Sequence, residues 1–275
     1  MTERIVVGVT DAAASRRAVD WAAQRAAQMG AVLVLIAVTK DAEDSEAVSA
    51  GDILLEAETA RLSVAIADAD LVVEAHAEHG DAVDVMVEAS RDAALLVLGD
   101  PHPGHHWGDH GRRISTAAHC AVAVVPDVDV EGRSGVVVGI DGSEVTEAAV
   151  AFAAAEAVRR GERLVAVAAW SPVLVGDGVM SGVPGFDYVE PIDLQEPTEL
   201  MVERALAAVR EAFPDLTIET QVQSGDPAPL LQTVASNAAL LVVGTHGRGP
   251  LARFFIGSVS DAVLTHAVTP TIAVR

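Results

Sequence analysis

Short apolar runs alternate with longer amphipathic stretches along the first half of the chain. The runs are rich in Val, Leu and Ile and cover residues 5–9, 31–38, 71–77, 94–98 and 121–125. A nearly continuous apolar run of this length is typical of a strand covered on both faces, and apolar residues at helical spacing are typical of a helix. The alternation predicts a parallel sheet with helices on both faces, wound by right-handed crossovers.

The second half of the chain repeats this order. Its apolar runs cover residues 136–140, 163–169, 217–222, 239–243 and 271–274. Gly8 and Gly139 are 131 positions apart (139 − 8), as are Gly30 and Gly161 (161 − 30). We therefore expect an α/β fold of two tandem doubly wound parallel five-stranded sheets, related by a pseudo-two-fold axis because similar units often pair in this way.

The length of 275 residues is sufficient for two domains of ordinary size. Polar residues interrupt the apolar pattern from Asp127 to Ser134, where we place a linker. The predicted domains are residues 1–128 and 134–275. Gly99 and Gly244 are 145 positions apart (244 − 99), so the second half holds 14 additional residues (145 − 131), which we assign to an insertion after residue 170.

A glycine-rich loop follows an apolar run near the C-terminus. From Leu240 the chain reads LLVVGTHGRGPLARFFIGS, with the spacing Gly244-x2-Gly247-x9-Gly257-Ser258. Glycines let the main chain approach an anion closely, and the N–H groups at the start of a helix point toward it. The order of strand, loop and helix predicts a phosphate-binding loop, although the spacing is neither that of a P-loop nor that of the Rossmann fingerprint.

This spacing resembles the nucleotide-binding signature of the universal stress protein family, and the whole chain resembles a tandem member of that family. The resemblance implies an adenine nucleotide alpha-hydrolase-like fold with an ATP site in the second half. Ligands of open parallel sheets bind beyond the carboxyl ends of the strands, where three segments of this half converge. The residues implied as nucleotide-binding are Ile140, Asp141, Ala169, Val243, Gly244, His246, Gly247, Arg248, Arg253, Gly257, Ser258, Val259 and Ser260.

The resemblance further implies a cytoplasmic, ATP-binding stress-response regulator that acts through protein contacts, with Mg²⁺ on the phosphates. It implies pairing through the terminal strands, either between the two domains of one chain or in a homodimer, and a protein partner that the sequence does not identify. No catalytic constellation stands out, so no dedicated enzymatic activity is expected. Slow ATP hydrolysis assisted by His246 and a nucleotide-independent scaffold stay open as alternatives.

The corresponding site of the first half departs from this pattern. Thr10 stands where the second half has Asp141, and His102 stands where a glycine is expected three residues after Gly99. Asp100 places a negative charge beside any phosphate, and neighbouring prolines remove N–H donors. We expect weak or no ATP binding in the first half.

Two loops leave alternatives open. The first-half loop is rich in potential metal ligands, namely Asp100, His102, His105, His106, Asp109 and His110. Such side chains can bind Zn²⁺ or Ni²⁺, but an eroded loop with exposed histidines is the favoured interpretation, and no metal site is predicted. The insertion at residues 171–196 is rich in Gly and Pro, and a lid over the nucleotide, a dimer contact and a flexible loop are all compatible with it.

Composition limits the partners and the compartment. Forty acidic and 18 basic residues give a formal charge of −22, which repels nucleic acid and anionic membranes, so we predict neither as a partner. The single cysteine, Cys120, excludes a disulfide framework within the chain and is expected to be a buried structural thiol in a reducing compartment. No signal peptide is visible, and no apolar run approaches the ~20 residues that span a bilayer. These features favour the cytoplasm.

Overall fold

The computed structural model describes residues 2–40, 45–66, 70–100, 109–175, 190–245 and 256–275. The first half contains β1 (Arg4–Gly8), α1 (Ala13–Met29), β2 (Val32–Thr39), α2 (Ser45–Ala65), β3 (Val73–His79), α3 (Ala82–Ala89), a 3₁₀ turn (Ser90–Asp92), β4 (Leu95–Asp100), α4 (Asp109–Ala117) and β5 (Ala121–Pro126). All five strands predicted for this half are present, with ends that differ by one or two residues.

The second half contains β6 (Val136–Gly139), α5 (Thr146–Arg160), β7 (Leu164–Trp170), β8 (Val173–Val175), β9 (Glu190–Ile192), α6 (Gln195–Ala212), β10 (Ile218–Ser224), α7 (Pro227–Ala235), β11 (Leu240–Gly244), α8 (Ser258–Thr265) and β12 (Thr271–Val274). The five strands predicted here are also present. The sequence did not predict β8 and β9, which form a separate two-stranded antiparallel ribbon within the insertion.

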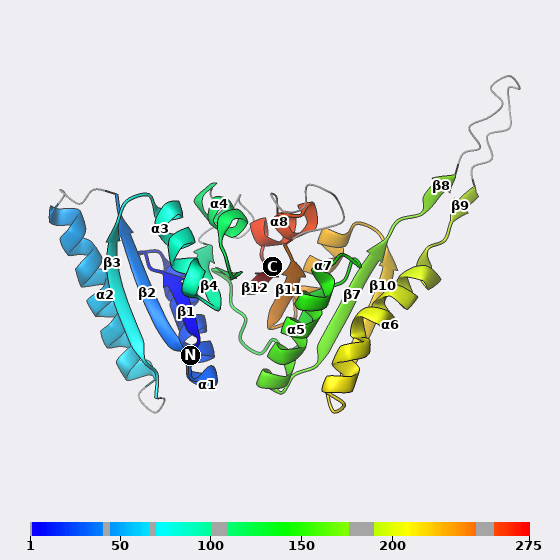
Figure 1. Ribbon diagram of the computed structural model, residues 1–275, viewed down its shortest axis with the longest axis horizontal. Coiled ribbons are helices and arrows are strands. Elements are labelled where there is room, and N and C mark those ends of the chain that lie inside the picture. Colours follow the sequence, from blue (N-terminus) through cyan, green and yellow to red (C-terminus); the bar gives the residue numbers. More distant parts are fainter. Residues whose placement is uncertain (1, 41–44, 67–69, 101–108, 176–189, 246–255) are drawn as a thin grey trace, which may run out of the picture.

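The two halves join into one sheet of ten strands, in the order β10-β7-β6-β11-β12-β5-β4-β1-β2-β3 (Figure 1). Each half is parallel throughout and has the same internal order, which confirms the doubly wound α/β fold. The halves meet where β5 and β12 pair antiparallel. The pairing covers two strand edges that would otherwise expose unpaired main-chain groups.

The register of this junction locates the pseudo-two-fold axis. Gly99 and Gly244 are equivalent in the repeat, and they pair with Val125 in β5 and with Val274 in β12. Residues of β5 and β12 are therefore equivalent when they are 149 positions apart (274 − 125). By that offset Ala123 is equivalent to Ile272 (272 − 123), and these two residues are partners in the β5–β12 ladder. The axis therefore passes between them.

Two cores cover the two faces of the sheet. The helices α1, α2, α5 and α6 pack on one face, and α3, α4, α7 and α8 pack on the other. Alanines such as Ala22 and Ala153 are fully buried, which lets α1 and α5 lie close to the β-branched residues of the strands. Both helices end at a left-handed glycine, Gly30 at φ 63° and Gly161 at φ 65°, as their equivalent positions in the repeat require.

The insertion extends beyond the sheet. Figure 1 shows β8 and β9 leaving the end of β7 and pointing away from the rest of the molecule. Residues 176–189 lie outside the described part of the chain, so a lid, a dimer contact and a flexible loop all stay predictions. At the base of the ribbon, the Trp170 Nε1–H donates to Gln195 Oε1 at 2.6 Å, which ties the end of β7 to the first residue of α6.

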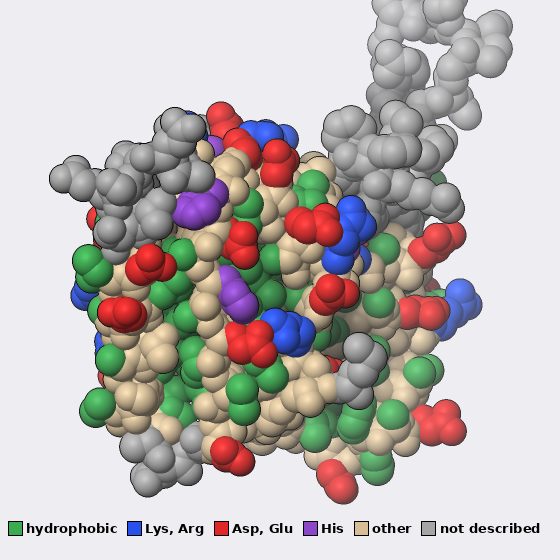
Figure 2. Space-filling view, turned by 60° about the vertical axis from the view of Figure 1, so that its left-hand side comes forward, with side chains coloured by type: hydrophobic (Ala, Val, Ile, Leu, Met, Phe, Trp, Pro, Cys, Tyr) green, Lys and Arg blue, Asp and Glu red, His purple; other side chains and the backbone are tan. Residues whose placement is uncertain are grey.

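The surface carries the acidic excess of the composition. On the face shown in Figure 2, Asp and Glu side chains are scattered over the surface and Lys and Arg are fewer. None of the described helices combines the length and the apolarity that crossing a membrane demands.

Candidate functional site

The second half has a topological switch point between β6 and β11. The chain leaves β6 toward β7 on one side, and it later returns to place β11 on the other. Helices α5 and α8, which follow these two strands, pack on opposite faces of the sheet. In open α/β sheets, ligands bind in the crevice at the carboxyl edge of such a switch point. The predicted site residues Ile140 and Asp141 follow β6, and Val243 and Gly244 end β11.

Asp141 is held at this edge by the start of α5. The buried Ile140 donates its N–H to the Val167 carbonyl at 2.8 Å, which extends the sheet ladder by one residue. Asp141 Oδ1 then accepts hydrogen bonds from the Ser143 N–H at 2.9 Å and from Thr146 Oγ1 at 2.8 Å. These bonds orient an exposed carboxylate at the rim of the crevice.

The two ends of the glycine loop are fastened to each other. Thr245 is buried and donates its N–H to the Val274 carbonyl at 2.7 Å, and the Gly257 N–H donates to the Thr245 carbonyl, also at 2.7 Å. The hydroxyl of the buried Ser260 donates to the Gly244 carbonyl. The described residues on either side of 246–255 are therefore held together at the end of β11.

Helix α8 begins at this loop with an open N-terminus. Gly257 precedes it with φ −59° and ψ 149° and offers no side chain as an acceptor. In α3 and α7, by contrast, Asp81 and Asp226 accept hydrogen bonds from the first helical N–H groups. Ser258 is exposed at the start of α8 and Val259 is half-buried, so N–H groups and a hydroxyl are available to an anion there.

Gly244 allows β11 to end close to α5. A Cβ atom at Gly244 would lie 3.2 Å from Val145 Cγ1, which is tighter than an ordinary contact. Ala169 lies on the other side of β6, half-buried near the end of β7 and paired with Gln223. The fold thus brings the ends of β6, β7 and β11 to one edge, as the sequence predicted.

Four predicted site residues fall outside the described part of the chain, and they stay predictions: His246, Gly247, Arg248 and Arg253. Two contributors were missed, Thr146, which holds Asp141, and Thr245, which anchors the loop. The position of Thr146 five residues after Asp141 and at the start of a helix was the available signal for the first, since Thr is common at such positions.

The first half closes the equivalent crevice more tightly. A Cβ atom at Gly99 would lie 2.6 Å from the Ala14 carbonyl oxygen, so the start of α1 lies against the end of β4. The Thr10 N–H is occupied by Ser15 Oγ at 2.8 Å. By the offset of the last strands, Asp109 is equivalent to Ser258 (258 − 149), so a carboxylate begins α4 where a hydroxyl begins α8.

The described residues contain no cluster of three or more His, Cys, Asp or Glu side chains that could hold a metal ion. Of the histidines in the first-half loop, His102, His105 and His106 lie outside the described residues, whereas His110 lies in α4. The favoured interpretation of that loop, without a metal site, stays a prediction.

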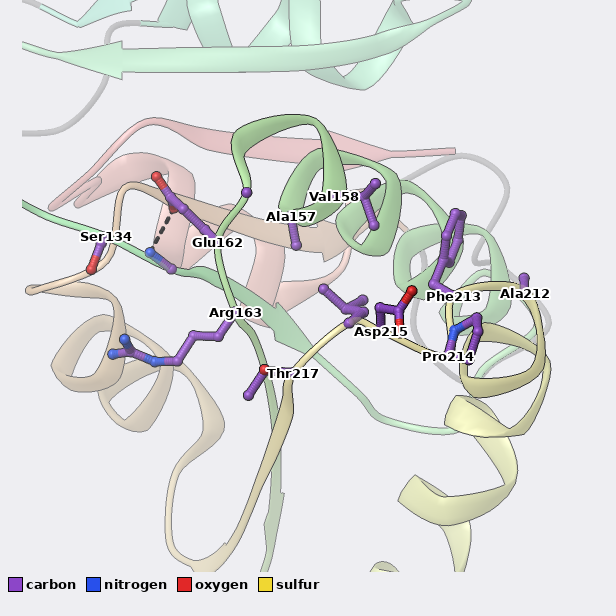
Figure 3. Close-up of a pocket in the computed structure, with 13 residues that line it drawn as sticks. Ser134, Ala157, Val158, Glu162, Arg163, Ala212, Phe213, Pro214, Asp215 and Thr217 are labelled. Carbon is purple, nitrogen blue, oxygen red and sulfur yellow. Dashed lines mark hydrogen bonds between the residues drawn. The ribbon is translucent and has the colours of Figure 1, made fainter.

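A cavity of about 650 Å³ lies at the opposite edge of the sheet, near the amino ends of β6 and β7 (Figure 3). It is bordered by the ends of α5 and α6 and by Glu162, Arg163 and Asp215. Glu162 Oε2 accepts from the Gly135 N–H at 2.6 Å. No predicted site residue borders this cavity, so the candidate site rests on the geometry of the switch point.

The sequence matches the universal stress protein family twice, over residues 1–126 and 133–275. The chain belongs to this family, as a tandem member. It is similar to the universal stress protein Rv2623 of Mycobacterium tuberculosis, with 34% identity over 98% of this chain and 96% of that protein. It is also similar to Rv2005c of the same organism, with 38% identity over 76% of this chain and 71% of that protein.

Solved structures of the family share the fold. A universal stress protein from Archaeoglobus fulgidus matches 99% of this chain and 98% of its own with a TM-score of 0.74, at 15% identity. Two other family structures each cover less than half of this chain, with TM-scores of 0.39 and 0.36. Their titles describe one in complex with cAMP and the other, from Arabidopsis thaliana, with AMP bound. Some universal stress proteins therefore bind nucleotides.

Proposed function

We propose that the second half binds one ATP molecule at the switch point and that the protein acts as a stress-response regulator whose protein contacts depend on the nucleotide. One observation carries the proposal. The Gly257–Thr245 and Ser260–Gly244 hydrogen bonds join the described residues that flank the glycine-rich segment, and they hold the open start of α8 beside the end of β11. A backbone with this form is suited to a phosphate chain.

Each predicted residue has a role in this proposal. Asp141 accepts a hydrogen bond from a ribose hydroxyl or the adenine amino group, and Ile140, Ala169 and Val243 offer backbone groups and apolar surface to the base. The glycines and the Ser258 hydroxyl surround the phosphates, with Val259 in the first turn of α8. Ser260, predicted as a further donor, is buried and already donates its hydroxyl to the Gly244 carbonyl, so its role is to hold the start of α8 in place. His246, Arg248 and Arg253 offset the phosphate charge. Because the whole chain carries a charge of −22, Mg²⁺ bound to the phosphates would reduce their repulsion.

The first half is proposed not to bind ATP. The N–H of Thr10 is already occupied by Ser15, and the start of α1 lies against Gly99. A carboxylate at Asp109 begins α4, so a phosphate there would meet a negative charge at the position where Ser258 offers a hydroxyl.

Calorimetric titration of the nucleotide-free protein with Mg·ATP tests the proposal. We expect one site per chain, loss of binding in Gly247→Glu, and at least a tenfold weaker affinity in Asp141→Asn, because an amide is a poorer acceptor than a carboxylate. Asp11→Asn, which changes the nearest first-half acid, is the matched control and should bind normally. Two sites would contradict the assignment of the first half, and no binding would favour the nucleotide-independent scaffold.

In this proposal the protein acts in the cytoplasm, and nucleotide binding changes how it associates with other proteins. The single cysteine, Cys120, is buried just before β5. Sedimentation of the protein with and without Mg·ATP would show whether the chain, whose two halves already pair through β5 and β12, also forms a homodimer. An identical sedimentation coefficient in both conditions would argue against nucleotide-dependent association.

A further inference from the structure

The pseudo-two-fold axis brings equivalent residues of the two halves into contact on both faces of the sheet. A residue on such an axis meets its own equivalent, as Ala123 meets Ile272 in the β5–β12 ladder. In a pair of identical halves, each axial residue would therefore face a copy of itself. In this chain the axial residues differ between the halves, and two of the axial pairs carry opposite charges.

The first such pair is buried between α1 and α5. Arg25 forms an ion pair with Glu156, and the two positions are equivalent in the repeat (156 − 25 = 131). The Arg25 and Glu156 side chains are only 6% and 4% exposed. The Arg25 guanidinium also lies 5.4 Å from the centre of the Phe152 ring, which supports it through a cation–π contact.

A neighbouring pair of equivalent residues is also in contact. Arg159 donates to the Gln28 side chain, and these positions are again 131 apart (159 − 28). Arg159 also forms an ion pair with Glu156 at 2.6 Å. Thus Glu156 receives an arginine from each half. Burial lowers the pKa of Arg25, and the charges of Glu156 and, more weakly, of the first-half Glu3 oppose that effect.

The second ion pair lies on the other face of the sheet, between α4 and α8. Arg112 Nε lies 3.1 Å from Asp261 Oδ1. These residues are 149 positions apart (261 − 112), the offset that relates β5 to β12, so they are equivalent too. In both ion pairs the first half supplies the arginine and the second half supplies the carboxylate.

We propose that the axial surface of the first half, Arg25 and Arg112 with Gln28, is a docking surface specific for a second half of this chain and rejects another first half. Two first halves would bring Arg25 against Arg25 in a buried setting and Arg112 against Arg112, without Glu156 and Asp261 to pair with them. Burying like charges without a counter-ion is strongly unfavourable. The partner choice is thus set by charge, whereas the main-chain pairing of β5 with β12 is indifferent to sequence.

Charge reversal in the full-length chain tests the proposal. Arg25→Glu and Glu156→Arg each place like charges on the axis. We expect each to lower the equilibrium constant for folding in urea by about 1,000-fold or more, with most of the loss recovered in the double variant. Arg112→Asp and Asp261→Arg, at the exposed pair, should show the same recovery with a smaller loss of about fivefold. This second cycle keeps the test valid if the buried reversals do not fold.

Partner choice is then read directly by native mass spectrometry. One variant carries Arg25→Glu and Arg112→Asp, so the positions of both axial ion pairs are acidic in both of its halves. The other variant carries Glu156→Arg and Asp261→Arg, so the same positions are basic in both of its halves. We expect an exchanged one-to-one dimer from their mixture and none from wild-type protein or from either variant alone. Additive losses in the two cycles, or the absence of the mixed dimer, would overturn the proposal.

Discussion

Cys120 shows how burial controls the chemistry of one side chain. The thiol is buried just before β5, and its Sγ–H donates to the Ala121 carbonyl at 3.3 Å. Burial disfavours the thiolate and raises the pKa of Cys120 to about 11. The expectation of a buried structural thiol agrees with this environment.

Cys120 should therefore be unreactive in the native protein. We predict that a disulfide reagent such as DTNB labels less than a tenth of the protein in minutes at pH 8 and labels it fully in urea. The chain has a single cysteine, so the absorbance change reports this thiol alone. Fast labelling without denaturant would contradict the burial of Cys120.

Glu156 predicts a dependence of stability on pH. Burial opposes its ionisation, but the hydrogen bond from Arg159 and the charge of Arg25 outweigh that effect and hold the pKa of Glu156 below its ordinary value. A carboxyl with a lowered folded-state pKa stabilises the protein above its unfolded pKa of about 4.3, and this contribution is lost as the pH falls through the folded value.

We expect Glu156→Gln to cost about 3 kcal/mol of unfolding free energy at neutral pH, because it leaves Arg25 buried without its charge partner. The difference between the variant and wild type should shrink as the pH is lowered below about 4. Glu203→Gln is the control, since the Glu203–Arg210 pair is solvent-exposed and contributes little. A difference that does not change with pH would contradict the ion-pair explanation.

At the scale of elements, the ends of β4 and β11 differ in how closely a helix approaches them. A Cβ atom at Gly99 would meet main-chain atoms, the Ala14 carbonyl oxygen at 2.6 Å and the Ser15 nitrogen at 2.8 Å. At Gly244 the nearest atom is a side-chain methyl of Val145 at 3.2 Å, which can move. The same repeat position is therefore constrained more strongly in the first half.

We predict that Gly99→Ala destabilises the protein by about 1–3 kcal/mol through this overpacking and that Gly244→Ala costs less than about 1 kcal/mol. Urea unfolding of the two variants side by side gives the comparison. An equal loss in both, or a larger loss in Gly244→Ala, would show that the approach of α1 to β4 is looser than described.

The sequence predicted the strands well because each is a continuous apolar run between helices, and the repeat provided a second, independent copy of the same pattern. It missed β8 and β9, since three-residue strands inside a Gly- and Pro-rich insertion carry no periodicity to detect. It also missed the roles of Thr146 and Thr245. The contact of Thr146 with Asp141 is local, whereas the contact of Thr245 with Val274 depends on how β11 pairs with β12. The ends of β6 and β11 were predictable from the apolar runs, whereas the hydrogen bonds that join the residues after these strands were not predicted.

At the scale of the whole molecule, the two halves are joined by hydrogen bonds as well as by the covalent linker. The β5–β12 ladder makes one sheet, and the side chain of Arg275 after β12 donates to the Ser115 and Thr116 carbonyls at the end of α4. Arg133 in the linker donates to the Val268 carbonyl at 2.6 Å. These contacts couple the stability of one half to that of the other.

We therefore expect a core substitution in one half to affect both. Leu96→Ala removes a fully buried side chain from β4 and should cost about 2–5 kcal/mol. Hydrogen exchange read by mass spectrometry should then show faster exchange in β6 and β11 as well as in β1 and β4. Faster exchange confined to residues before 127 would show that the halves unfold independently.

The opposite charges on the pseudo-two-fold axis have an evolutionary consequence. Covalent linkage fixes the ratio of the two halves at one to one, so a change at Arg25 can be compensated only at Glu156, and a change at Arg112 only at Asp261. Tandem relatives that have exchanged the sign at one of these positions should have exchanged it at the other. In a tandem chain of this kind, the two members of each axial pair would be expected to vary together.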